Sequence, residues 1–327
     1  MRVRDVNTLL FMTENNDLRR DLETLRAFSR SFSDTPFPKQ VVFETTAHCN
    51  LKCPMCPQPT MLRTMGRMEL ALFRKVIDEI AEWGAPNLEI WFAVHGEPLL
   101  LGTGLKDYID YAWEKTHAKL CLNTNGIPMN EKHAEWLVRS PLDKVIVSID
   151  GHSAETYEAA RVGAKYSHIK ENTLRFLKLL AVQPEPKPKA VVQMVLMPNN
   201  VHERDAFRDY WTSQGATVKI KPYLEWAGAC KTDKPLTLPP ERVTCQWVMS
   251  SIHVLWDGRV PQCGPDTECE ELQGNMNTDK LLDIWRERHR VARLRHLEQR
   301  WGDLPPICRR CKDWAAGPAE WMNDGLR

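Results

Sequence analysis

The sequence lacks three features that would point to particular classes of protein. It has no excess of one charge, because 44 Lys and Arg residues face 43 Asp and Glu residues and leave a formal net charge of +1. We therefore expect no broad electrostatic field for holding nucleic acid. No apolar run approaches the roughly 18 residues that a membrane-spanning helix needs. Internal repeats and low-complexity tracts are also missing.

The N-terminal segment argues against export. It reads MRVRDVNTLLFMTENNDLRR, meets charges before an apolar core can form, and has no small-residue cleavage site. We therefore expect it to be neither a signal peptide nor a membrane anchor. We expect a soluble, cytoplasmic protein that binds neither nucleic acid nor membrane.

The composition is that of a globular protein, with 43% hydrophobic and 27% charged residues among 327. This length predicts about two domains. Twelve Trp residues are a high number. Most of them are expected to pack in the core or at its rim, and the rest could form flat walls around a ring-shaped ligand.

The pattern of apolar residues predicts a helix over residues 5–31 and then an alternation of strands and helices. Six strands with five intervening helices indicate an α/β fold with parallel pairing and right-handed crossovers. The composition changes at Lys231, which gives an N-terminal extension (1–37), a core (38–230) and a C-terminal domain (231–327). The expected strands are 40–45, 88–93, 118–122, 144–149, 190–196 and 217–223. The expected helices are 69–83, 105–115, 131–139, 169–182 and 202–214.

Ten cysteines carry the most specific information, because metal binding or catalysis explains them better than disulfides in a cytosolic chain. Cys49, Cys53 and Cys56 follow the first strand with the spacing C-x3-C-x2-C. Three thiolates on one short loop can ligate three irons of a cubic cluster and leave the fourth iron open. The alternatives are a structural zinc loop that lacks one ligand, or three buried cysteines.

This loop, directly after a first strand, resembles the signature of the radical S-adenosylmethionine (radical SAM) enzymes. Gly96 and Glu97 in VHGEPLL resemble the motif that holds the SAM amino group, with His95 where glycine is more usual. Met55 occupies the position that touches adenine. The motif LNTNG, which contains Asn125, follows the third strand.

Two further motifs follow the fourth strand. Ser148 and Asp150 in VSIDG resemble the ribose-binding pair, and Arg161 resembles the arginine that pairs with the SAM carboxylate. The resemblance covers roughly residues 38–225 and implies a partial (β/α)6 TIM-type barrel. It also implies that SAM binds the open iron and yields a 5′-deoxyadenosyl radical that abstracts hydrogen from a C–H bond. Flavodoxin or ferredoxin is the expected electron donor.

A second cysteine set lies in the C-terminal domain and consists of Cys245, Cys263, Cys308 and Cys311. A hairpin turning at Asp257-Gly258 is expected to bring Cys245 near Cys263. Four thiolates fit a tetrahedral zinc ion as well as an iron–sulfur cluster. The hairpin, GN-x-x-L-x-x-I-W and the final C-x2-C resemble the SPASM/twitch auxiliary domain, with a spacing like that of the cyclitol dehydrogenase of aminoglycoside biosynthesis.

The resemblance therefore implies two [4Fe-4S] clusters, one that binds SAM and one auxiliary. A cluster ligated by four thiolates has no open iron, so its expected role is electron transfer, with a structural role as the alternative. Of the remaining cysteines, Cys121 is expected in the core, while Cys230 and Cys269 are candidate hydrogen-atom donors.

Candidate substrate contacts follow the sixth strand. Lys219, Lys221, Tyr223 and Glu225 share one alternating face. Glu225 is the candidate catalytic base, with His253 as a second choice. Stacking against a sugar or nucleoside ring is expected from Trp226, Trp247 and Trp314.

The preferred function is oxidation of a secondary alcohol to a ketone on a sugar, cyclitol or nucleoside in natural-product biosynthesis. Epimerisation, decarboxylation or carbon–carbon coupling on such a substrate is the runner-up. Peptide modification comes third. The alternative outside enzymes is a zinc-binding interaction protein on a degenerate barrel.

Overall fold

The computed structural model describes residues 23, 25–85, 87–185, 187–230, 238 and 240–316. Of the expected N-terminal helix, residues 25–30 are helical, and residues 5–22 lie outside the described part. Most of the segment after Cys230, where the composition changes, also lies outside it.

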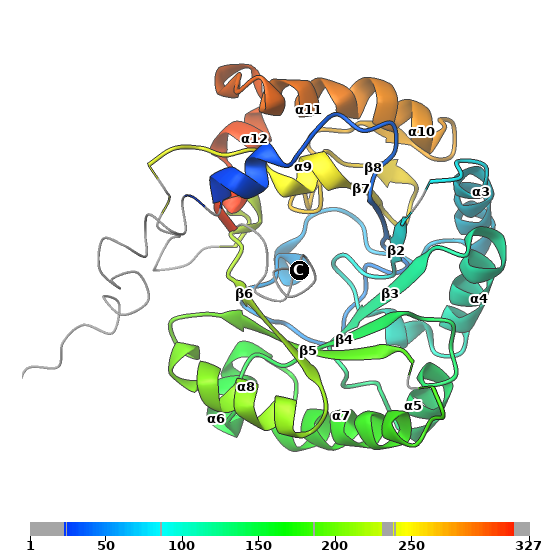
Figure 1. Cartoon of the computed structure of the whole chain (residues 1–327), viewed down its shortest axis with the longest axis vertical. Helices are drawn as coiled ribbons and strands as arrows, with labels where there is room; N and C mark the ends of the chain where they lie inside the picture. The colour runs from blue at the N-terminus through cyan, green and yellow to red at the C-terminus, as the bar shows by residue number, and fades with distance from the viewer. Residues whose placement is uncertain are drawn as a thin grey trace, which may run out of the picture.

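A curved parallel sheet forms the centre of the molecule (Figure 1). Its seven strands are hydrogen-bonded in the order β6-β5-β4-β3-β2-β1-β7, and each of the six predicted strands is present. The seventh strand was not anticipated. The strands are β1 (Gln40–Phe43), β2 (Glu89–Trp91), β3 (Lys119–Thr124), β4 (Lys144–Ser148), β5 (Lys189–Leu196), β6 (Thr217–Pro222) and β7 (Ser251–Val254).

Helices cover the outer face of this sheet (Figure 1). In α3, Phe73, Val76, Ile77 and Ile80 are all buried, as expected for an amphipathic helix with one apolar face. The short helix α6 was missed because seven residues show too little periodicity. The outer helices are α3 (Leu70–Ala81), α4 (Gly104–Thr116), α5 (Glu131–Leu137), α6 (Ala154–Ala160), α7 (Tyr166–Ala181) and α8 (Arg204–Ser213).

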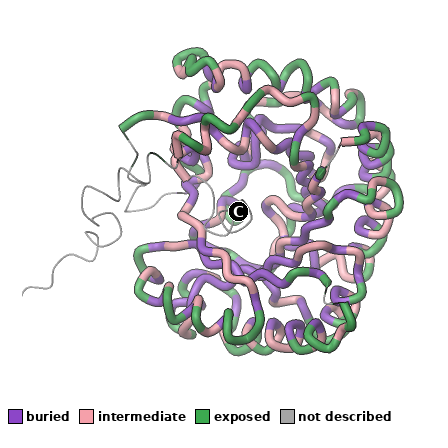
Figure 2. The backbone as a smooth tube through the Cα atoms, in the orientation of Figure 1, coloured by how far each residue is buried: buried purple, intermediate pink, exposed green. Residues whose placement is uncertain are grey.

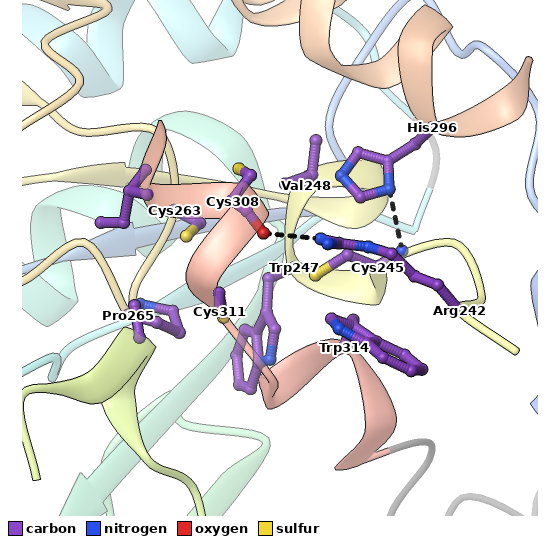
Figure 3. A pocket seen from close by; sticks show the side chains of 12 residues that line it. Arg242, Cys245, Trp247, Val248, Cys263, Pro265, His296, Cys308, Cys311 and Trp314 are labelled. Atoms are coloured by element: carbon purple, nitrogen blue, oxygen red, sulfur yellow. Dashed lines mark hydrogen bonds between the residues drawn. The ribbon is translucent and has the colours of Figure 1, made fainter. Parts of the chain in front are cut away.

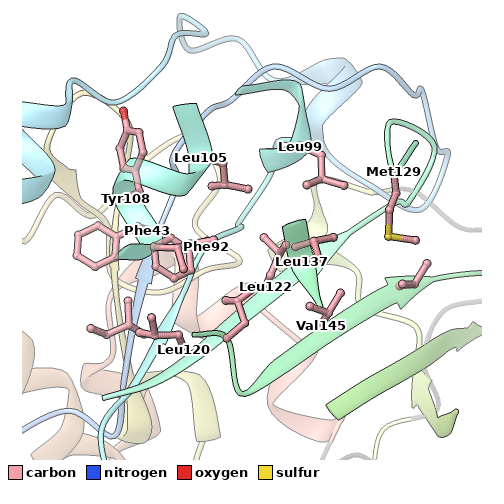
Figure 4. Close-up of a cluster of buried hydrophobic side chains, with 14 of the residues drawn as sticks. Phe43, Phe92, Leu99, Leu105, Tyr108, Leu120, Leu122, Met129, Leu137 and Val145 are labelled. Atoms are coloured by element: carbon pink, nitrogen blue, oxygen red, sulfur yellow. The ribbon is translucent and has the colours of Figure 1, made fainter. Parts of the chain in front are cut away.

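The main hydrophobic core lies between the strands and the outer helices, and burial follows the strands in Figure 2. Phe43, Phe73 and Tyr108 pack edge to face or tilted, with ring centroids 4.8 and 4.9 Å apart (Figure 4 shows Phe43 and Tyr108). Cys121 is 1% exposed, which agrees with its predicted place in the core. Apolar side chains project from both faces of the central strands. The sheet therefore packs against the outer helices on one face and towards the barrel interior on the other.

The C-terminal region corrects the predicted hairpin. The chain does turn at Asp257-Gly258, where Gly258 has φ +90°. Its first arm, however, is β7, which pairs in parallel with β1 at the edge of the barrel. The second arm, β8 (Arg259–Val260), pairs with β9 (Gly274–Asn275) instead. The sequence SIHV alone cannot distinguish these partners, since both pairings bury the same residues.

Short helices complete this region beside β7. The predicted helix near Leu281 is present, and it continues through a π-helical turn at Ile284–Arg288. The helices are α9 (Gln246–Ser250), α10 (Leu281–Asp283), α11 (His289–Leu297) and α12 (Pro306–Arg310). No helix in the described ranges is long and apolar enough to cross a membrane.

Candidate active site

A cavity with a volume of about 150 Å³ lies at the carboxyl ends of the strands. Loops after β1, β2 and β3 contribute to it, together with side chains of β4, β5 and β6. This is the end at which a βα barrel carries its chemistry. Among the predicted residues, the cavity is lined by Cys49, Cys53, Met55, Cys56, Gly96, Glu97, Asn125, Ser148 and Arg161.

The three cysteines of the first loop face this cavity together. Burial raises the pKa of all three thiols, that of Cys56 to about 12. Asn125 Nδ2 lies 3.8 Å from Cys49 Sγ, and Arg161 Nη1 lies 3.9 Å from Cys53 Sγ. Buried thiols next to donors fit a metal cluster, because bound metal replaces their protons and compensates for burial of the thiolate.

Gly96 explains how Glu97 reaches the cysteine loop. A Cβ atom at Gly96 would lie 2.0 Å from the carbonyl oxygen of Thr46, so only glycine permits this approach. The Glu97 N–H then donates to the His48 carbonyl at 2.9 Å. The loop after β2 is thereby docked on the loop that carries the cysteines.

The Glu97 carboxylate is fully buried and accepts three hydrogen bonds. The donors are Thr124 Oγ1 at 2.6 Å, the Asn125 N–H at 2.6 Å and the Leu99 N–H at 3.0 Å. Burial nevertheless raises the pKa of Glu97. A cation bound in the cavity would stabilise the charged carboxylate, which suits a residue that receives an ammonium group.

Asp150 and Arg161 form a buried ion pair rather than two separate ligand contacts. Arg161 Nε and Nη2 lie 2.6 Å from Asp150 Oδ2, and Asp150 Oδ1 accepts the Val195 N–H at 2.7 Å. Burial acts to lower the pKa of Arg161, but Asp150, Cys53 and Tyr157 together outweigh it and raise the pKa. Asp150 therefore orients Arg161, which lines the cavity. Ser148 donates to Asn123 at 3.3 Å.

A carboxylate–imidazole pair lies at the cavity, with His95 in its lining and Glu44 behind His95. His95 Nδ1 lies 3.2 Å from Glu44 Oε1, and Glu44 also accepts two hydrogen bonds from the Arg63 guanidinium. Arg63 Nη2 lies 3.3 Å from the same Nδ1, so a carboxylate oxygen and a guanidinium both face this ring nitrogen. His95 Nε2 is buried and has no hydrogen-bond partner among the described residues. Sequence analysis missed Glu44 and Arg63, which have no motif.

Charged residues of β6 extend into the barrel. Lys221 lines the cavity, and burial lowers its pKa. Lys219 lies one step deeper, and burial together with Lys221 lowers its pKa to about 7. The prediction that this face of the strand points inward is consistent with both.

The second cysteine set surrounds a smaller cavity (Figure 3). Cys245, Cys263, Cys308 and Cys311 all line it, although Cys245 and Cys311 are 66 residues apart. Burial raises the pKa of each thiol, that of Cys308 to about 12. Arg242 lies beside them and donates to the Cys308 carbonyl at 2.7 Å. Four buried thiols and one guanidinium fit a thiolate-ligated cluster.

The predicted base and hydrogen donors have other surroundings. Within the described ranges, Glu225, His253, Cys230 and Cys269 are not among the residues that line the larger cavity. Glu225 Oε2 lies 3.4 Å from Lys312 Nζ. Burial lowers the pKa of His253 to about 3 and raises that of Cys230 and Cys269 to about 12.

The three tryptophans predicted to stack on a ring divide between the cavities. Trp226 lines the larger cavity, where its ring lies 5.5 Å from that of His95. Trp247 and Trp314 line the smaller one. Only Trp226 is therefore placed to contact a molecule bound beside the first cysteine loop.

Comparison with known proteins assigns both halves of the chain. Residues 43–210 match the family model of the Radical SAM superfamily, and residues 245–312 match the SPASM model, an iron-sulfur cluster-binding domain. A curated relative is the probable GTP 3′,8-cyclase of Methanococcus maripaludis strain C5. It is 29% identical over 180 residues, which cover 55% of this chain and 57% of the cyclase. The match thus spans little more than half of that relative.

Solved structures share the fold. BtrN in complex with AdoMet and 2-DOIA superposes with a TM-score of 0.60 at 19% identity, over 85% of this chain and 94% of BtrN. SuiB of Streptococcus suis, bound to the precursor peptide SuiA, gives a TM-score of 0.61 at 13% identity, over 86% and 74% of the two chains. These structures confirm the expected barrel architecture.

Proposed function

The chain belongs to the radical SAM superfamily and carries a C-terminal SPASM domain, and from this premise we propose that it oxidises a secondary alcohol of a small hydroxylated molecule to a ketone. The observation that carries the proposal is the second cysteine set, whose four thiols surround one cavity. Such a set leaves no iron open for substrate and suits an electron acceptor.

Cys49, Cys53 and Cys56 would hold the first [4Fe-4S] cluster, and Glu97 and Arg161 would hold the amino and carboxylate groups of SAM. When bound, these cofactors supply a 5′-deoxyadenosyl radical that removes a carbon-bound hydrogen. The protein binds and orients the substrate and keeps water away from this step. Met55, Gly96, Asn125 and Ser148 line the same space and complete the proposed SAM site.

The proton of the substrate hydroxyl needs an acceptor, and we assign it to His95 in preference to Glu225. His95 lines the cavity, and its Nε2 has no hydrogen-bond partner. With its ring proton on Nδ1, His95 would accept at Nε2, and the Glu44 carboxylate 3.2 Å from Nδ1 would stabilise the imidazolium against the Arg63 guanidinium 3.3 Å away. Glu225 instead lies near Lys312.

The interior polar residues support a hydroxylated substrate. Asn123, Gln193 and Lys221 line the cavity beyond the proposed SAM contacts, and their amide and ammonium groups can hydrogen-bond to several hydroxyls. Trp226 offers a ring face to the substrate. Lys221 also accommodates a substrate that carries a negative charge.

Two other outcomes use the same radical. A thiol that returns hydrogen to the opposite face would give an epimer. The relatives also include an enzyme named for GTP cyclisation. The likeness to SuiB, solved with a precursor peptide, supports peptide modification as the second candidate.

The test is anaerobic turnover with candidate sugars, cyclitols, nucleosides and short peptides, followed by mass spectrometry of both products. Oxidation gives a product two hydrogens lighter, together with one 5′-deoxyadenosine for each turnover. A product of unchanged mass that carries one deuterium from heavy water would replace oxidation by epimerisation. In that case Cys230→Ala or Cys269→Ala should abolish the reaction.

A further inference from the structure

Two consecutive residues separate the two cavities. Trp226 lines the larger cavity beside the first cysteine loop, and Ala227 lines the smaller cavity beside the second cysteine set. Both have left-handed backbone conformations, with φ values of +50° and +53°. Residues with a Cβ atom rarely adopt this conformation, so their surroundings must impose it.

Asp313 provides that constraint from the C-terminal domain. Its side chain is fully buried, and its two oxygens accept the backbone N–H groups of Glu225 at 2.7 Å and Ala227 at 2.8 Å. Asp313 comes two residues after Cys311, and its own N–H lies 3.3 Å from Cys311 Sγ. One carboxylate thus joins the loop of Trp226 to a predicted cluster ligand.

Trp226 connects this loop to the first cysteine site. Trp226 Nε1 donates to the carbonyl oxygen of Met55 at 3.1 Å, and Met55 lies between Cys53 and Cys56 in the sequence. Hydrogen bonds therefore run from Cys311 through Asp313 and the Trp226–Ala227 pair to the first cysteine loop. We refer to Asp313, Trp226 and Ala227 as the bridge.

We propose that the bridge couples the two sites, with Asp313 as the positioning residue that holds Trp226 against the first cysteine loop. This inference relies on the proposed assignment of the two cluster sites, but not on the substrate. A change at Asp313 should then alter the binding of SAM in the other domain. Because coupling is reciprocal, SAM should also change the midpoint potential of the second cluster.

The test uses the reconstituted full chain with SAM as the ligand. Asp313→Asn keeps the shape of the side chain, but its NH2 group cannot accept one of the two backbone N–H bonds. We expect SAM to bind about 5- to 10-fold more weakly, measured from the change that SAM causes in the EPR spectrum of the reduced first cluster. The potential shift of the second cluster on SAM addition should also shrink.

Asp266→Asn is the matched control. Asp266 is equally buried in the C-terminal domain and accepts backbone N–H groups from Gln262, Glu270 and Glu271. None of its hydrogen bonds in the described residues reaches the bridge. SAM affinity in this variant should equal that of the parent protein.

Trp226→Phe tests the bridge without touching the C-terminal domain. It keeps a ring but removes the hydrogen bond to Met55, so SAM affinity should fall while both clusters stay at full iron content. If Asp313→Asn loses its second cluster, Trp226→Phe still tests whether the bridge couples the two sites. Parent-like SAM affinity and an unchanged potential shift in Trp226→Phe would overturn the coupling. Failure of the proposed oxidation shows instead as absence of the lighter product from the parent enzyme.

Discussion

The two cysteine sites are built in opposite ways. The first takes three cysteines from eight consecutive residues and opens onto a cavity of about 150 Å³ with a mixed polar and apolar lining. The second takes four cysteines from three separate segments and closes around a small, mainly apolar cavity. Arg161 and Glu97 stand beside the first set, and Arg242 stands beside the second.

This difference assigns different tasks to the two sites. An incomplete ligand set next to free space can bind a cofactor and a substrate. A complete set without such space can exchange electrons and hold the fold together. The predictions below separate these tasks, beginning with the largest effect.

Removing the first ligand set should abolish all SAM chemistry. The Cys49→Ala, Cys53→Ala, Cys56→Ala triple variant should keep about four of about eight irons per chain and form no 5′-deoxyadenosine with reductant. Iron analysis and chromatography of the nucleoside products measure both effects. The Cys121→Ala variant is the control, because Cys121 is a buried residue outside both sets. A parent chain with one tightly bound zinc and no iron would contradict the cluster assignment.

Removing the second ligand set should separate the two tasks. In the Cys308→Ala, Cys311→Ala variant, about four irons remain and SAM is still cleaved, but the oxidised product is lost because the electron has no acceptor. The ratio of ketone to 5′-deoxyadenosine measures this uncoupling. Equal loss of both products, with the first cluster intact, would assign the second site a structural role.

Much of this comparison could be predicted from the sequence because its signals are local. The spacing of Cys49, Cys53 and Cys56 and the alternation in the six strands each lie within a few residues. The bridge could not be predicted, since Asp313 and Glu225 are 88 residues apart and no motif marks either one. The pairing of β7 with β1 could not be predicted either, because one apolar strand fits several partners.

Glu97→Gln should weaken SAM binding without affecting either cluster. A neutral amide leaves the SAM ammonium group unpaired in a buried site, and such a loss corresponds to about 10- to 100-fold in affinity. Equilibrium binding followed by EPR gives the value. Glu89→Gln is the control, since Glu89 begins β2 at the opposite end of the barrel. Equal affinities in the two variants would mean that Glu97 does not contact the ammonium group.

Acid should lower the stability of the region around β7 and α11 before that of the barrel helix α3. Burial lowers the pKa of His253, His289 and His296 to about 3, against about 6.5 in an unfolded chain. Below pH 6.5 the unfolded state therefore gains protons that the folded state does not. Stability is complete above this pH and falls as the pH drops towards 3, by about 2 kcal/mol per histidine at pH 5.

Hydrogen exchange at pH 7 and pH 5 measures this loss. We expect reduced protection in β7 and α11, compared with α3, after correction for the intrinsic exchange rates. His289→Gln should lessen the loss, because a glutamine side chain gains no proton between pH 7 and pH 5. Its amide can still donate to the Gln262 carbonyl that His289 Nε2 contacts at 2.8 Å, which preserves the folded contact. Equal losses in α3 and α11 would show that these histidines do not determine the acid response.

The smallest expected effect is on stability and concerns Ala227 of the bridge. A buried Ala→Gly change ordinarily costs about 1.5 kcal/mol, about 0.8 from the lost methyl group and the rest from unfolded-chain entropy. Ala227 has φ +53°, and glycine relieves about 1–2 kcal/mol of left-handed strain. Ala227→Gly should therefore change the free energy of unfolding by less than about 0.5 kcal/mol. Ala229→Gly, in the same loop but exposed and with φ −71°, should cost about 0.5–1 kcal/mol. Denaturant unfolding of the two variants side by side gives the comparison. A larger loss of stability for Ala227→Gly than for Ala229→Gly would mean that the backbone at Ala227 is not strained. Asp313 would then hold a conformation that the chain adopts even without its hydrogen bonds.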